Sequence, residues 1–161
     1  MKKTKNIKER LHDHLKMIEK LNSIKLEKEC LYGTLRSPNF SGMPGGGDKR
    51  TSEEERLFLR IQELDKKAER KQAEIDRDWA ELEPLIEQLS PIETLIMNLR
   101  YRYGGEWPDV CFAIFGKRSD YEIEVDSYQN KMFKAHGRAL CSIADMMVRA
   151  DVRMEREPTT H

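Results

Sequence analysis

Apolar side chains recur every three or four positions through two long stretches of the N-terminal half of the chain. The first stretch, residues 3–35, contains no proline and a single glycine near its end. Its apolar positions are Ile7, Leu11, Leu15, Ile18, Leu21, Ile24, Leu31 and Leu35. The second stretch repeats the spacing at Leu57, Ile61, Leu64, Ala68, Ile75, Trp79, Leu82, Ile86 and Leu89. Such spacing places the apolar side chains on one face of a helix, so it predicts two long helices.

The start of the second helix is marked by Ser52, followed three residues later by Glu55, which is the spacing of a capping box. Residues 36–51 then form a glycine-rich loop between two helices of similar length, and we expect an antiparallel hairpin of the coiled-coil type. One hairpin buries only one stripe per helix, so we expect two copies to associate as a homodimer. The residues assigned to oligomerisation are Leu57, Ile61, Leu64, Ile75, Trp79 and Leu82.

The loop contains two glycines, Gly42 and Gly47, at the separation found in phosphate-binding P-loops. Asp48 occupies the position where that motif requires lysine, and the flanking segments are helices rather than a strand and a helix. Nucleotide binding is therefore not expected. Phe40 and Met43 leave two interpretations of the loop open, a flexible cap and a tip that docks a partner.

A second group of three helices is predicted for residues 90–150. Ser90, Pro91 and Glu93 carry the signature of a helix start, again with capping-box spacing, and Gly104 with Gly105 ends that helix after Tyr103. A short helix follows over residues 107–116, and a long one begins near residues 126–127. The predicted fold is all-α, with a hairpin over residues 1–89, a compact three-helix domain over 90–150 and a flexible tail over 151–161.

Composition narrows the function. The 161 residues include 29 Lys and Arg and 29 Asp and Glu, a balance that excludes an indiscriminately basic binder. The three cysteines are far apart and have no histidine at zinc spacing, which indicates a reduced cytosolic protein without a metal. The segment "HDH" at residues 12–14 is interpreted as solvated helix surface, because neighbours two apart do not share a face. No membrane span, signal peptide, cofactor motif or catalytic motif is found, so we expect no enzyme.

The last long helix has an apolar face and an opposite face of amides and cations. Glutamine and asparagine side chains can bond adenine, and lysine and arginine can reach guanine or phosphate. Three helices with a short middle one fit a helix-turn-helix domain, whose recognition helix enters the major groove with its N-terminal part. A polar outer face needs no ligand, however, so the pattern alone leaves both interpretations open.

The segments "LSPIETLIMNLRYRYGGEWPDVCFAIFG" and "SYQNKMFKAHGRALCSIADM" resemble sigma factor region 4. With the hairpin and the "SPNFSGMPGGG" loop, the chain resembles phage-encoded late transcriptional regulators of the ArpU and RinA type over most of its length. The resemblance implies that Gln129, Asn130 and Lys134 face base edges, and that Lys131, His136 and Arg138 make phosphate or flanking contacts. It also implies core positions for Leu99, Trp107, Val110, Phe133 and Leu140.

One departure from the family pattern concerns the turn between the last two helices. A helix-turn-helix has about three or four residues there, whereas "KRSDYEIEVD", residues 117–126, is longer and acidic. The insert either opposes DNA phosphates or meets a protein partner.

We therefore expect a sequence-specific DNA-binding regulator of phage or prophage genes. Its partners would be double-stranded DNA and host RNA polymerase, its state a homodimer and its location the host bacterial cytosol. The alternatives are a DNA-packaging protein of the small terminase kind and a coiled-coil interaction protein that does not bind DNA.

Overall fold

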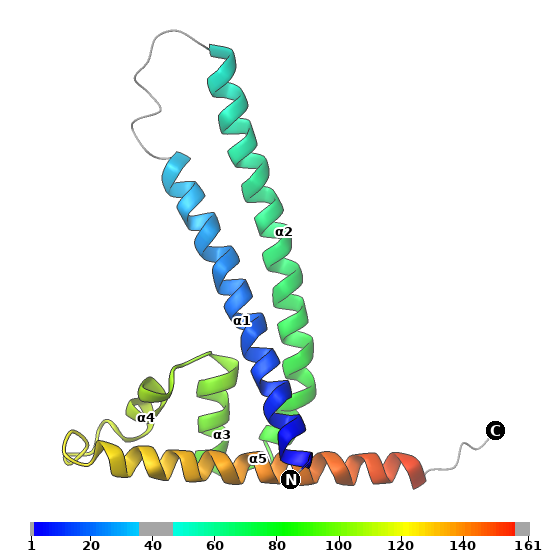
Figure 1. Ribbon diagram of the computed structural model, residues 1–161, viewed down its shortest axis with the longest axis vertical. Helices are drawn as coiled ribbons and strands as arrows, with labels where there is room; N and C mark the ends of the chain where they lie inside the picture. The colour runs from blue at the N-terminus through cyan, green and yellow to red at the C-terminus, as the bar shows by residue number, and fades with distance from the viewer. Residues whose placement is uncertain (1, 36–46, 157–161) are drawn as a thin grey trace. The chain divides into compact units, whose positions relative to one another are not determined.

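The computed structural model describes residues 2–35 and 47–156, with side chains described over 6–35 and 53–154. Every regular element in these ranges is helical (Figure 1). In chain order they are α1 (Lys2–Leu35), α2 (Gly47–Ile86), α3 (Pro91–Met97), the π-helical turn η2 (Asn98–Arg102), α4 (Trp107–Phe115) and α5 (Val125–Arg156). This confirms the prediction of an all-α fold in which a long helix pair precedes a small helical domain.

The contacts divide the chain into two compact units. The first combines Met1–Leu15 with Asp78–His161, and the second is Lys16–Arg77. The sequence pattern placed a boundary between residues 89 and 90. The contacts instead group the first turns of α1 and the last turns of α2 with the C-terminal helices.

The core of the first unit is built around α5, on which both α3 and α4 pack (Figure 1). One cluster joins Ile7 and Leu11 of α1 to Leu82 of α2, and to Leu140 and Ile143 of α5. A second cluster fills the space between α3, α4 and the start of α5. Its buried members are Ile96, Val110, Cys111, Phe115, Tyr128, Met132 and Ala135. Burying each large aliphatic side chain contributes about 1.5–3 kcal/mol, so α5 carries much of this unit's stability.

In the second unit α1 and α2 run antiparallel. Residues early in this part of α1 face residues late in α2, since Leu21 and Lys25 share a surface groove with Ala73 and Asp76. Further along α1, Lys28 pairs with Asp65 at 2.8 Å and Glu27 pairs with Arg60 at 2.9 Å. Buried Leu21, Ile61, Leu64 and Ile75 form the apolar stripe predicted from the sequence.

Helix α3 begins where the sequence predicts, but the capping box at its start is wrong. Ser90 is the N-cap in extended conformation and Pro91 follows at the first helical position, yet the Ser90 side chain makes no capping hydrogen bond. The Thr94 hydroxyl instead donates to the carbonyl of Ile86 at 3.1 Å, and Glu93 faces Arg138. The joint between α2 and α3 is therefore held by threonine and the rigid proline ring.

Three helix ends differ from the prediction. Helix α2 begins at Gly47, inside the predicted loop, and ends at Ile86 rather than near Leu89. Helix α5 continues to Arg156, so residues 151–156 are helical rather than a flexible tail. The loop residues Phe40, Gly42 and Met43 lie outside the described residues. The Ser52 side chain also lies outside the described side chains, so the predicted capping box of Ser52 and Glu55 lies outside them as well.

Candidate nucleic-acid interface

The connection between α4 and α5, residues 116–124, is a series of hydrogen-bonded turns. The amide of Arg118 donates to the carbonyl of Phe115, and the amide of Glu124 donates to that of Asp120. Aromatic rings cover these turns: Tyr121 lies 5.7 Å from Phe112 and 5.8 Å from Tyr128, measured between ring centroids. The connection that is longer than a helix-turn-helix turn is thus an ordered series of turns that ends at the start of α5.

The insert's acidic side chains differ in what they contact. The Asp120 carboxylate accepts a 2.7 Å hydrogen bond from the Tyr128 hydroxyl, and this bond is the main cause of the raised pKa of Tyr128. Glu122, Glu124 and Asp126 are exposed around the start of α5. The cations of α5 come later, from Lys131 onward, so negative charge surrounds the first turn and positive charge the following turns.

Asn130 and Lys134 lie on one exposed face of α5, because residues four apart in a helix are neighbours on its surface. Neither side chain makes a hydrogen bond or ion pair with another described residue. Gly137 and Cys141 continue the same face along the helix. These positions present an amide and a cation that are free to bind another molecule.

The other cations predicted for DNA binding have intrachain contacts. The Lys131 ammonium lies 5.0 Å above the ring of Tyr128, and the Arg138 guanidinium lies 3.4 Å from the carboxylate of Glu93. The Arg138 side chain is still 63% exposed, whereas Glu93 is only 12% exposed. Lys131 and Arg138 thus remain at the surface, but their positions are partly set by Tyr128 and Glu93. The amide Gln129, predicted to face base edges, is half-buried.

His136, predicted to make a phosphate or flanking contact, instead points into the first unit, against Tyr101 and Trp107. Its Nε2 lies 2.8 Å from the hydroxyl of Tyr101, and its ring stands 4.7 Å from that of Trp107. Burial, with smaller contributions from the charges of Lys8 and Arg100, lowers the pKa of His136 to about 4. Burial also raises the pKa of Tyr101 to about 12. A protonated phenol and a neutral imidazole therefore share this hydrogen bond, whose direction depends on the imidazole tautomer, and His136 carries no charge that a phosphate could use.

Phe133 is a second correction, because it was predicted as core and is 45% exposed. Its ring packs edge-on against Trp107, with centroids 5.2 Å apart. Of the other predicted core residues, Val110 and Leu140 are buried, and Leu99 and Trp107 are partly buried. Helical spacing located the apolar side of α5 correctly, but Phe133, at the edge of that side, was wrongly assigned to the core.

His14 is a third correction, since the segment around it was interpreted as solvated surface. Its side chain is 1% exposed, and its Nδ1 lies 2.5 Å from the carboxylate of Asp78. Arg10 contacts the same carboxylate at 3.5 Å, and the ring of Trp79 is 5.5 Å from that of His14. His14 is thus a buried polar member of the first unit's core, which spacing within α1 alone could not reveal.

The residues assigned to oligomerisation are mostly covered by the chain itself. Ile61, Leu64 and Ile75 are buried in the second unit, and Trp79 and Leu82 in the first, while Leu57 is half-buried. A second chain can reach the buried five only if the packing that covers them within the chain opens. The surface for such a partner must therefore be sought elsewhere.

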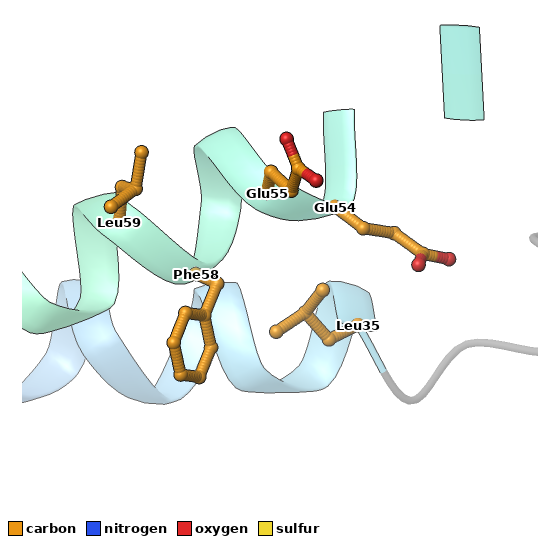
Figure 2. A pocket seen from close by; sticks show the side chains of 5 residues that line it. All are labelled: Leu35, Glu54, Glu55, Phe58 and Leu59. Carbon is orange, nitrogen blue, oxygen red and sulfur yellow. The ribbon is translucent and has the colours of Figure 1, made fainter. Parts of the chain in front are cut away.

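A shallow apolar groove lies in the second unit where α1 ends and the described part of α2 begins. It is lined by Leu35, Glu54, Glu55, Phe58 and Leu59, and Figure 2 shows Phe58 beside Leu35. Phe58 and Leu59 are more than half exposed. The sequence contained a signal for this surface: three consecutive apolar residues, 57–59, cannot all face the same stripe of a helix.

Other kinds of site receive no support within the described ranges. No group of three or more His, Cys, Asp or Glu side chains is placed to hold a metal ion there. In those ranges no helix combines the length and the apolar character needed to cross a bilayer. Cys30 and Cys141 are exposed free thiols, and Cys111 is a buried one. Comparisons of the chain with family models, curated proteins and solved structures find no match.

Proposed function

We propose that this chain binds double-stranded DNA through α5, with α4 as the supporting helix, and regulates transcription. The observation that carries the proposal is the exposed face of α5, where Asn130 and Lys134 have no partner among the described residues. An amide can bond the paired donor and acceptor of adenine, and a lysine can reach guanine or a phosphate. The resemblance to phage-encoded regulators makes control of phage or prophage genes the form of this function that we propose, with host RNA polymerase as an assisting partner.

The charge distribution sets how strong this binding should be. Residues 85–150 carry eight basic and nine acidic side chains. Much of protein–DNA affinity comes from neutralising phosphates, so a nearly neutral module binds weakly to random DNA. Discrimination between sequences must then come from a few base contacts, and the exposed acids before α5 should keep phosphates away from the connection. Two copies, each with one α5, would strengthen binding to a two-part operator.

The test starts from a library of random duplexes, since the operator is unknown. Repeated selection with the full chain should enrich a common sequence, and that sequence should be retarded in gels more strongly than a scrambled duplex as salt rises. Lys134→Ala should weaken binding about tenfold and lower the salt dependence by about one counterion. Lys67→Ala, an exposed lysine of α2 in the second unit, is the matched control and should bind like the wild type.

If no sequence is enriched and no duplex is retarded at low salt, the DNA-binding function is excluded. Unchanged binding by Lys134→Ala would leave DNA binding in place but remove α5 as the reading helix.

A second candidate function, protein recognition, is favoured by one observation on the α4 to α5 connection. Ile123 is 84% exposed between the acidic Glu122 and Glu124, and Phe112 of α4 is 63% exposed. An exposed apolar side chain between two carboxylates suits a partner surface that is apolar with a basic rim. Binding of such a partner is compatible with a DNA-binding α5, because these residues precede the cations of α5.

A further inference from the structure

Gly137 lies in the interior of α5, far from either end of the helix. Glycine is the least favourable residue in a helix interior except proline, because its backbone loses the most freedom on folding. Gly137 is also exposed, and a Cβ atom built there would meet nothing within 4 Å. Alanine would thus fit without displacing any described atom, and the fold has no need for glycine at this position.

Three described glycines next to helix ends, Gly104, Gly105 and Gly116, have a structural reason to be glycine. A Cβ atom at Gly116, after α4, would come within 2.4 Å of the carbonyl oxygen of Phe112, and one at Gly105 within 3.0 Å of that of Leu99. Gly104 has a φ of 70°, a conformation that side chains disfavour. Each of these has a reason inside the chain. Gly137 has no such reason. Gly33 also has open space around it, but it lies near the end of α1, whereas Gly137 lies in a helix interior beside two cations, so we seek its reason in a molecule that approaches from outside.

The neighbours of Gly137 on the exposed face indicate the chemistry of that molecule. Lys134 and Arg138 lie within one turn on either side, and Asn130 lies on the same face further toward the start of α5. A face of cations and an amide suits a polyanion. It does not suit a second copy of α5 placed symmetrically on this face, because that arrangement would bring Lys134 and Arg138 of both copies together.

We propose that Gly137 is the point at which a DNA strand's sugar–phosphate backbone approaches α5 most closely, between Lys134 and Arg138. This inference rests on the DNA-binding function proposed above. Without a Cβ atom at position 137, the strand can come closer to the helix backbone, so that both flanking cations reach phosphates. The proposal assigns to α5 a steric requirement that neither charge nor helical spacing predicts.

The experiment compares Gly137→Ala with Gly33→Ala in the full chain. Gly33 is the matched control because it is exposed near the end of α1 and a Cβ atom there would also meet nothing within 4 Å. Both substitutions replace a helical glycine, and Gly137→Ala should raise the melting temperature by about 2–4 °C. Binding is measured by gel retardation of a labelled random-sequence duplex at low salt and of any duplex enriched by selection.

We expect Gly137→Ala to weaken binding of both duplexes about tenfold, the loss expected when a phosphate contact is pushed out of reach. Gly33→Ala should bind like the wild type. A more stable protein that binds less well is a combination that damage to the fold cannot produce.

Three outcomes would overturn the proposal. If the wild type binds and Gly137→Ala binds equally well, the close approach is wrong while the DNA-binding function stands. If the wild type retards no duplex, both fall. If Gly137→Ala lowers the melting temperature, or weakens self-association without changing DNA binding, then the glycine serves the fold or a protein contact.

Discussion

The ring of His136 shows how the environment of one side chain decides its role. Its ring lies against the hydroxyl and ring of Tyr101 and against the ring of Trp107, and the charges that act on it are those of Lys8 and Arg100. All of these favour the neutral imidazole, because the ring is partly buried and both charges are positive. The residue therefore affects the stability of the first unit through protonation.

We predict that stability falls as the pH drops from about 6.5 through about 4 because of this histidine. Its folded-state pKa of about 4 lies below the unfolded value of about 6.5, so the unfolded chain binds the proton first. The loss should reach about 2 kcal/mol once solvent screening at a half-buried ring is allowed for. Urea unfolding at steps between pH 7 and pH 4 measures it, compared with His136→Phe, which keeps a ring but cannot be protonated.

Carboxylates titrate in the same range, so the informative quantity is the difference between the wild type and the variant. That difference should change across the window for His136→Phe. It should not change for His12→Gln, which replaces an exposed histidine of α1. Parallel pH profiles of the wild type and His136→Phe would contradict the assignment of a buried, neutral imidazole.

Single residues were also where sequence reasoning failed. Helical spacing separates an apolar from a polar side, but it cannot say where a second element covers the edge of that side. Residues near the edge were therefore misplaced: His136 is turned inward beside Tyr101, Phe133 is left half exposed, and His14 is covered. Each of these residues contacts a residue more than twenty positions away in the chain. The spacing of apolar residues within one helix carries no information about such contacts.

At the scale of helices, the sequence was more informative. The periodicity of apolar residues predicted every long helix, and Pro91, Gly104 and Gly116 marked ends that the structure confirms. Ends without such a residue were missed: α5 continues beyond residue 150 because nothing in its sequence stops it before Arg156. Glycines were equally misleading at the start of α2, where helix begins at Gly47 within the glycine-rich segment.

The pair formed by buried His14 on α1 and partly buried Asp78 on α2 offers a test of how these helices are held within the first unit. The His14 ring is covered and its Nδ1 lies 2.5 Å from Asp78, so removing Asp78 leaves the buried imidazole without this bond, and removing His14 leaves a partly buried carboxylate with Arg10 alone. We predict that His14→Ala costs about 3 kcal/mol in the free energy of unfolding, and that a double-mutant cycle with Asp78→Ala gives a coupling energy of about 1–2 kcal/mol.

The control cycle uses Lys71 and Glu74 on α2, whose ammonium and carboxylate are 2.7 Å apart and whose side chains are 23% and 46% exposed. Neither member of this pair is fully buried, so solvent and salt screen it and its coupling should be smaller than that of His14 and Asp78. Equal coupling in the two cycles, measured by denaturant unfolding at pH 7, would show that burial adds nothing to the interaction between His14 and Asp78.

At the scale of the whole molecule, the proposed function favours a homodimer that presents two copies of α5 to DNA, and such a dimer needs a surface on which the two chains pack. The apolar stripe of the helix pair is already used within the chain, since Ile61, Leu64 and Ile75 are buried. Among the residues of the second unit whose side chains are described, the exposed large apolar ones are Leu26, Tyr32, Phe58 and Leu59. Phe58 and Leu59 line the groove with Leu35, so this groove is the surface on which we expect a second copy to pack.

We predict a homodimer by light scattering, with twice the 19.0 kDa of one chain, that Phe58→Ser combined with Leu59→Ser converts to monomer. Phe112→Ser is the matched control: it removes a phenylalanine of similar exposure, 63% against 56% for Phe58, from the first unit and should leave the mass unchanged. A wild type that is monomeric at all concentrations would exclude the dimer, and an assembly of about eight or more chains would favour packaging over regulation.

Loss of selected-operator binding in the monomeric variant, with random-duplex binding retained, would connect the groove to DNA recognition, because only a dimer gains affinity from a two-part operator.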